Sequence, residues 1–101
     1  MIEANGEQVA LVTGASKGIG QAICVELAQS GYRIVVNYMS DEKGALDTLE
    51  MVRKAGSDGQ IIQFDVSDFD QTQSAVGDIL KQNGSIDAPV SYTHLRAHET
   101  T

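Results

Sequence analysis

The stretch VALVTGASKGIGQAICVELAQSG, residues 9–31, decides the fold because its hydrophobic pattern changes in the middle. Residues 9–12 form a continuous apolar run, which is typical of a strand buried on both faces. From residue 18 to residue 30 the apolar side chains recur at helical spacing instead, as Ile19, Ala22, Ile23 and Leu27. Gly31 is a natural residue to end that helix. Residues 13–20 therefore join a buried strand to an amphipathic helix.

The same alternation continues along the chain. Residues 33–38 and 61–64 are rich in β-branched and aromatic residues, which favour strands. Two further helices are expected, with Ser40 and Ser67 as their N-caps and Gly56 and Gly84 as their ends. Their predicted inner faces are Ala45, Leu49 and Val52 in the first, and Phe69, Thr72, Val76, Ile79 and Leu80 in the second.

Strands that alternate with helices of this length require right-handed crossovers and a parallel sheet. The sequence therefore predicts an α/β fold. We expect a Rossmann-type doubly wound parallel sheet, truncated to about three strands and three helices, in the strand order 3-2-1.

Length and composition exclude several classes of protein. The 101 residues, 42% of them hydrophobic, suffice for one packed domain and not for several. Fourteen acidic and seven basic side chains give a net charge of -7, which argues against nucleic acid as a partner. The apolar runs are far shorter than the roughly 20 residues that span a bilayer, so no membrane partner is expected.

The first seven residues lack the basic and apolar regions of a secretory signal, and the single Cys24 cannot form an internal disulfide. We therefore expect a cytoplasmic protein. Cys24 has apolar sequence neighbours and no histidine nearby in the sequence, so it is expected to be an inert, reduced residue.

The turn TGASKGIG, residues 13–20, contains three glycines with different expected roles. Gly14 lets the chain turn sharply, Gly18 lets the backbone approach a pyrophosphate, and Gly20 lets the helix pack close to the sheet. The N–H groups at the start of the helix would point at the phosphates. The alternative is a tight turn that binds no ligand.

The spacing G-x-x-x-G-x-G in this turn resembles the cofactor motif of short-chain dehydrogenases/reductases. The resemblance extends over residues 6–87, through VVNY at 35–38, Asp65-Val66, and GSID at 84–87. Within the family it is strongest to the 3-oxoacyl-[acyl-carrier-protein] reductases. It implies NADPH-dependent reduction of 3-oxoacyl thioesters in fatty acid biosynthesis, an acyl-carrier-protein-bound substrate, and a homotetramer for the whole enzyme. The alternatives are another reductase of the family, acting on a sugar, steroid or alcohol, and a nucleotide-binding module without catalysis.

The resemblance also implies a set of cofactor-binding residues: Gly14, Ser16, Lys17, Gly18, Ile19, Gly20, Asn37, Tyr38, Ser40, Asp65 and Val66. Asp65 is expected to accept a hydrogen bond from the adenine amino group, with the backbone N–H of Val66 beside it. The alternative for Asp65 is a residue that only forms the turn before the next helix.

The choice between NADP and NAD depends on the end of the second strand. An acidic residue there holds the ribose 2′-OH of NAD and repels the 2′-phosphate of NADP. The resemblance places Tyr38 at that position, and Lys17 is a point charge that can reach the phosphate. NADP is therefore expected over NAD. Asp41 and Glu42 are interpreted as favourable charges at the start of a helix.

Residues 88–101 differ in composition from the rest. They contain the only proline, Pro89, and both histidines, His94 and His98. Pro89 would fall inside a strand that starts at Ile86 and lies beside the first strand, and it would stunt that strand. We therefore expect residues 1–87 to be the N-terminal part of an NAD(P)-binding Rossmann domain and residues 88–101 to be an irregular tail. The tail resembles translated adapter sequence, so the natural gene is expected to continue as a full reductase; the alternative is a small protein with a natural tail.

No catalytic or metal-binding residue is assigned. The Asn-Asn-Ala-Gly motif of the family and its catalytic Ser, Tyr and Lys are not found in the sequence. Tyr92 is followed four residues later by Arg96 and not by a lysine. The pair His94 and His98 has no third ligand at suitable spacing.

Overall fold

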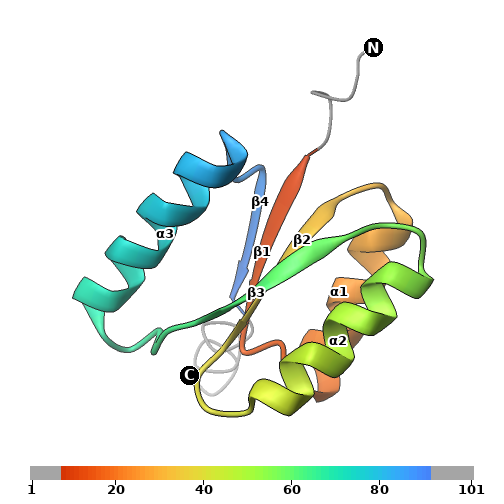
Figure 1. The fold of residues 1–101 in the computed structure, drawn as a ribbon, viewed down its shortest axis with the longest axis horizontal. Coiled ribbons are helices and arrows are strands. Elements are labelled where there is room, and N and C mark those ends of the chain that lie inside the picture. Colours follow the sequence, from red (N-terminus) through yellow and green to blue (C-terminus); the bar gives the residue numbers. More distant parts are fainter. Residues whose placement is uncertain (1–7, 92–101) are drawn as a thin grey trace, which may run out of the picture.

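The computed structural model describes residues 8–91, which form a four-stranded parallel sheet with helices on both faces (Figure 1). Its elements are, in order, β1 (Val9–Thr13), α1 (Gly18–Gln29), β2 (Arg33–Tyr38), α2 (Glu42–Lys54), β3 (Gly59–Gln63), α3 (Phe69–Asn83) and β4 (Ala88–Ser91). The strand order is β3-β2-β1-β4. The predicted parallel sheet and the order 3-2-1 are therefore confirmed.

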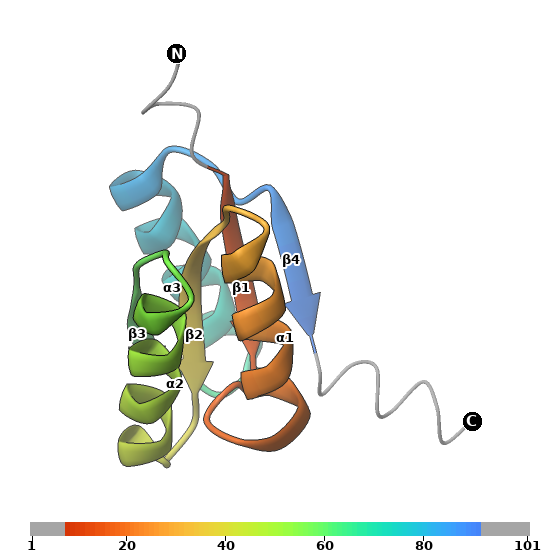
Figure 2. The ribbon, with the colours of Figure 1, turned by 90° about the vertical axis from the view of Figure 1, so that its right-hand side faces the viewer.

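The two faces of the sheet are covered unequally. Helices α1 and α2 pack side by side on one face, and α3 crosses the other (Figure 2). Along β1 the side chains alternate between the faces: Ala10 and Val12 pack toward α1 and α2, and Val9 and Leu11 pack with Ile79 of α3. This alternation explains why residues 9–12 are apolar throughout.

Helix α1 packs on the sheet through small residues, namely Gly20, Cys24 and Ala28. A Cβ at Gly20 would lie 2.6 Å from the carbonyl oxygen of Gly14 and 2.8 Å from the Cα of Ala15, closer than real side chains allow. The predicted role of Gly20 in close packing is confirmed. The predicted inner face was wrong in part: Ile19 is 58% exposed and Ala22 is exposed, because the close approach turns the smallest residues toward the sheet.

The second helix begins one residue later than predicted. Its N-cap is Asp41 rather than Ser40, and the carboxylate accepts a hydrogen bond from the N–H of Gly44 at 3.0 Å. The predicted inner face of Ala45, Leu49 and Val52 is buried, and Thr48 is buried with it.

The third helix differs more from the prediction. Asp68 caps it instead of Ser67, and its buried residues are Ala75 and Ile79. Phe69 and Leu80 are exposed, contrary to expectation. Phe69 is the first residue of α3, and its side chain is 71% exposed. Successive helical residues point about 100° apart, and the buried face of α3 includes Ile79 but not Leu80.

The fourth strand expected beside the first is confirmed: Ala88–Ser91 pairs with β1 in parallel, with Pro89 opposite Leu11. It begins at Ala88 rather than Ile86, so the described sheet has four strands instead of about three, and the expectation of an irregular chain after Asp87 is wrong for these residues. β4 is an edge of the described sheet, and a proline is tolerated there because its missing N–H can fall on the unpaired side. Asp87 fixes the start of this strand. Its N–H donates to the carbonyl of Val9 at 2.7 Å, and its carboxylate accepts from the N–H of Val9 at 2.8 Å.

Other assignments for the tail, at Tyr92, His94 and His98, lie outside the described residues. Within residues 8–91, no group of His, Cys, Asp and Glu side chains is placed to hold a metal ion. None of the helices in this part of the chain is long and apolar enough to cross a membrane.

Burial controls the chemistry of Cys24. Its side chain is fully buried, and desolvation raises the pKa of the thiol to about 12. The thiolate is the reactive form, and a raised pKa lowers its population. We expect the folded chain to react slowly with a thiol reagent between about pH 7 and pH 9, whereas the chain in denaturant, with an ordinary thiol pKa near 8.5, reacts fast and faster as the pH rises. Rapid labelling in native buffer would contradict this assignment.

Candidate nucleotide-binding site

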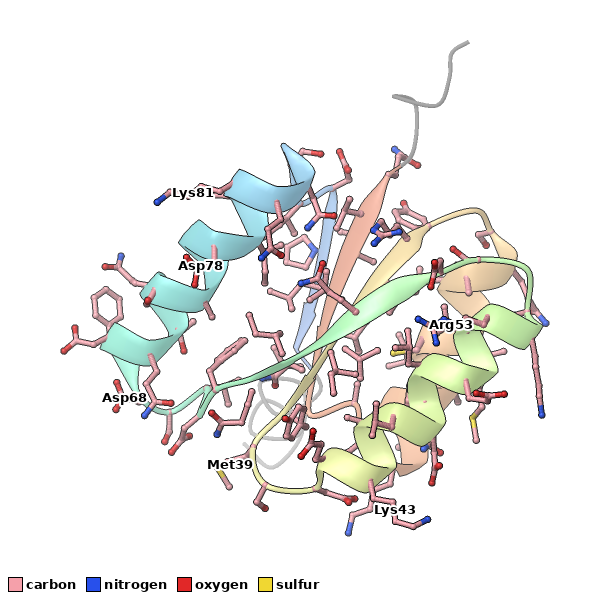
Figure 3. All side chains as sticks on the ribbon, in the orientation of Figure 1. Met39, Lys43, Arg53, Asp68, Asp78 and Lys81 are labelled. Carbon is pink, nitrogen blue, oxygen red and sulfur yellow. The ribbon has the colours of Figure 1, made fainter. Side chains whose placement is uncertain are left out.

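A pocket of about 750 Å³ lies where β1, β2 and β3 end. Three segments line it: Gly14, Ser16, Lys17, Gly18 and Ile19 after β1; Asn37 near the end of β2 with Met39, Ser40 and Asp41 after it; and Phe64, Asp65, Val66 and Ser67 after β3. Figure 3 shows Met39 in the turn after β2 and Asp68 at the start of α3, at the same end of the sheet. The carboxyl ends of strands in a parallel sheet are where such folds bind ligands.

The amino end of α1 opens into this pocket. Lys17 is the N-cap residue, and no side chain caps the helix. In the described part of the chain the other two helices each have an aspartate cap and an acidic residue in the first turn; α1 has neither. The partial positive charge of α1 is therefore left without a carboxylate, which suits an anionic ligand.

Gly18 makes this end of the helix accessible. Its φ of +63° is in the left-handed region, and nothing lies within 4 Å of the place where a Cβ would be. Gly14, with φ of +61°, makes the sharp turn out of β1. Both glycines occupy positions where a side chain is strained, and both line the pocket.

The side chain of Asn37 in β2 links the turns after β1 and β3 by hydrogen bonds. This side chain is 2% exposed. The carbonyl oxygen Oδ1 accepts from the N–H of Gly14 at 3.0 Å, and Nδ2 donates to the carbonyl of Phe64 at 3.1 Å. The backbone carbonyl of Asn37 also accepts from the N–H of Ala15 at 2.9 Å. The side-chain amide is thus bonded to protein groups, which makes Asn37 a support of the pocket wall.

Asp65 forms the turn before α3. One carboxylate oxygen accepts from both the N–H and the hydroxyl of Ser67, at 2.9 and 2.7 Å. These hydrogen bonds hold the pKa of the Asp65 carboxyl below its usual value. The turn-forming role weighed for Asp65 is confirmed. The same residue also lines the pocket, so a hydrogen bond to a ligand stays a prediction.

The structure brings together all the proposed cofactor-binding residues except Gly20 and Tyr38. Gly20 lies on the buried side of α1, against Gly14 and Ala15. Tyr38 packs against the core between the sheet and helices α1 and α2. Met39, Asp41, Phe64 and Ser67 also line the pocket, although no contact with a ligand was expected of them. One indication of their position in the pocket was present in the sequence, which is that each is a neighbour of an expected cofactor-binding residue in the same turn.

A parallel sheet with helices on both faces, a glycine-rich turn after β1 and an uncapped helix beside it define a Rossmann-like nucleotide-binding fold. Residues 8–92 match the short chain dehydrogenase family, and the chain belongs to that family. It is 39% identical over 82 residues to the 3-oxoacyl-[acyl-carrier-protein] reductase FabG of Staphylococcus aureus (strain Mu50 / ATCC 700699), covering 81% of this chain and 33% of that protein. The chain thus spans about a third of the length of that relative.

Two further similarities bear on the site. The short-chain dehydrogenase/reductase homolog YusS of Bacillus subtilis (strain 168) is 37% identical over 91 residues, which are 90% of this chain and 84% of that protein. A solved dehydrogenase from Burkholderia cenocepacia with bound NADP superposes with a TM-score of 0.78 at 26% identity. The superposition covers 84% of this chain and 33% of that one.

Replacing Asn37 tests whether its hydrogen bonds to the two turns contribute more to the free energy of unfolding than the single hydrogen bond of another asparagine. Asn37→Leu leaves the N–H of Gly14 and the carbonyl of Phe64 without their buried partner, so we expect a loss of about 2 kcal/mol or more in the free energy of unfolding. Asn83→Leu is the matched control, since its Nδ2 bonds only the carbonyl of Ile79 near the end of α3. Urea unfolding measures both. Equal losses for the two variants would contradict the bridging role of Asn37.

Proposed function

We propose that this chain is the cofactor-binding part of an NADPH-dependent short-chain reductase that reduces 3-oxoacyl thioesters carried on acyl carrier protein. The observation that carries the proposal is the uncapped, carboxylate-free start of α1, which opens into a pocket at the ends of the parallel strands. The similarity to FabG of Staphylococcus aureus supports the substrate class. A cytoplasmic location and a homo-oligomer for the whole enzyme are parts of the same proposal.

The residues of the pocket suit the parts of such a cofactor. Backbone N–H groups of the turn and of the start of α1 would hold the diphosphate, and Gly18 keeps that surface free of a side chain. Asp65 and Val66 would hold the adenine. NADPH supplies the hydride, and the protein supplies its position. The transfer itself needs residues beyond this sequence, which has no Tyr-x-x-x-Lys motif.

The choice of NADP over NAD depends on charge at the turns after β1 and β2. Lys17 is exposed and lines the pocket, so its ammonium can meet a 2′-phosphate. Asp41 opposes this choice, because it also lines the pocket. Its carboxylate, however, is bonded to the N–H of Gly44 as a helix cap, which takes it partly out of contact with the ligand. Tyr38 was expected to lie beside the ribose 2′ group. Met39 and Ser40 line the pocket instead, so these two residues would lie beside that group.

A second candidate is a nucleotide-binding protein without catalysis of its own. It is favoured by the similarity to YusS, because this chain covers 84% of that relative. The two candidates differ in one measurement. A catalytic parent enzyme oxidises NADPH in the presence of a 3-oxoacyl thioester, whereas a binding module takes up NADPH and leaves it unchanged. Sequencing of the gene past residue 87 decides which protein to assay.

Replacing Lys17 tests the cofactor assignment. We expect Lys17→Ala to weaken NADP binding about three- to tenfold and NAD binding less, since only NADP has the additional phosphate. The difference should shrink as salt is added, as expected of an exposed ion pair. Calorimetric titration of wild type and variant with both nucleotides measures it, and Lys43→Ala on the outer side of α2 is the control. An equal loss for NADP and NAD would assign Lys17 to the shared diphosphate instead.

A further inference from the structure

We propose that Thr48 of α2, with Gln21 of α1, is a positioning residue that directs the N–H groups of the glycine-rich turn at the diphosphate of the ligand. This inference rests on the proposed nucleotide binding, and it adds residues that lie outside the pocket. Neither Thr48 nor Gln21 lines the pocket, and the side chain of Thr48 is fully buried between the two helices and the turn.

The first observation is a pair of side chains bonded to successive carbonyls of the turn. The hydroxyl of Thr48 donates to the carbonyl of Ala15 at 2.8 Å. The amide of Gln21 donates to the carbonyl of Ser16 at 3.0 Å. The Thr48 hydroxyl also lies 3.0 Å from the carbonyl of Gly44, one turn back in its own helix. That carbonyl already has a partner in the helical pattern, so the shorter contact to the turn is the one that the helix does not otherwise supply.

The second observation is that α2 approaches the turn closely at Gly44. A Cβ there would overlap the carbonyl oxygen of Ser16. The Gln21 amide also reaches the carbonyl of Gly44 at 3.5 Å, which links the two helices at the same point. The absence of a side chain at Gly44 thus lets α2 reach the turn, and Figure 2 shows α1 and α2 side by side on this face of the sheet.

The consequence follows from peptide geometry. The described residues contain no cis peptide bond, and across a trans peptide the C=O of one residue and the N–H of the next point in opposite directions. Fixing the carbonyls of Ala15 and Ser16 toward α2 therefore points the N–H groups of Ser16 and Lys17 away from α2. Ser16 and Lys17 both line the pocket, so these N–H groups are set on the side where a diphosphate would lie. Preorganised donors bind an anion without the cost of reorientation.

The test compares Thr48→Val, which keeps the shape and removes the hydroxyl, with Thr48→Ser, which restores it. Calorimetry on the full chain measures binding of NADP, of ADP, and of adenosine 2′-monophosphate, which has no diphosphate. We expect Thr48→Val to weaken NADP and ADP about two- to tenfold, the range of one hydrogen bond, with little change for adenosine 2′-monophosphate. Thr48→Ser should recover most of the lost affinity. Gln21→Met should give the same pattern, and it serves as the second variant if Thr48→Val does not fold.

Ser57→Ala is the matched control. Its hydroxyl donates to the carbonyl of Tyr32 at 2.6 Å, a bond of the same kind at the opposite end of β2. We expect it to lower stability and to leave all three affinities unchanged. Equal weakening of all three ligands by Thr48→Val, or no weakening at all, overturns the positioning role while the proposed function stands. Failure of the wild-type chain to bind any of them overturns both.

Discussion

The carboxyl edge of the sheet depends on the buried amide of Asn37. Gly14 and Phe64 lie in the turns after β1 and β3, and Asn37 lies in β2 between these strands. The side chain of Asn37 hydrogen-bonds to both turns. Buried backbone groups must be hydrogen-bonded, and a turn that has left the strand ladder cannot bond in the ladder. One asparagine with both a donor and an acceptor satisfies this requirement on both sides. These hydrogen bonds hold the backbones of the turns in place beside the open pocket.

The acidic residues of the chain are distributed in agreement with this arrangement. The net charge is -7, yet the start of α1 has no carboxylate. The starts of α2 and α3 use aspartates where the macrodipole favours them, with Glu42 and Asp70 in the first turns. An acidic cap on α1 would stabilise that helix in the same way, but it would occupy the N–H groups that an anionic ligand needs. Local helix stability and ligand binding therefore compete at Lys17, and they do not compete at Asp68.

The sequence predicted most of the fold, because its signals were local and independent. The change of period after residue 12, the strand at 33–38 and the glycines at 31, 56 and 84, each with positive φ, all agree with the structure. It failed where tertiary packing decides between neighbouring residues. Ile19 and Cys24 are both compatible with an inner face of α1, and only the close approach at Gly20 determines that Cys24 is buried. Phe69 was placed inside by its hydrophobicity, whereas its position at the first turn of α3 leaves it exposed.

The pocket lining was accessible to sequence reasoning because strand ends are marked by the same residues that form turns. The supports behind the lining were not accessible. In the sequence, Thr48 is one polar residue on the inner face of a predicted helix. Nothing within residues 42–54 indicates that its hydroxyl donates a hydrogen bond to the carbonyl of Ala15, which is 33 positions away in sequence. Tyr38 shows the same limit in reverse. It ends β2 at the position where a ligand contact is expected, but the alternation along the strand turns its ring toward the helices, with Val36 and Ile34. The pleat fixes the direction of a side chain at a strand end, so at the end of β2 the residues Met39, Ser40 and Asp41 line the pocket and Tyr38 does not.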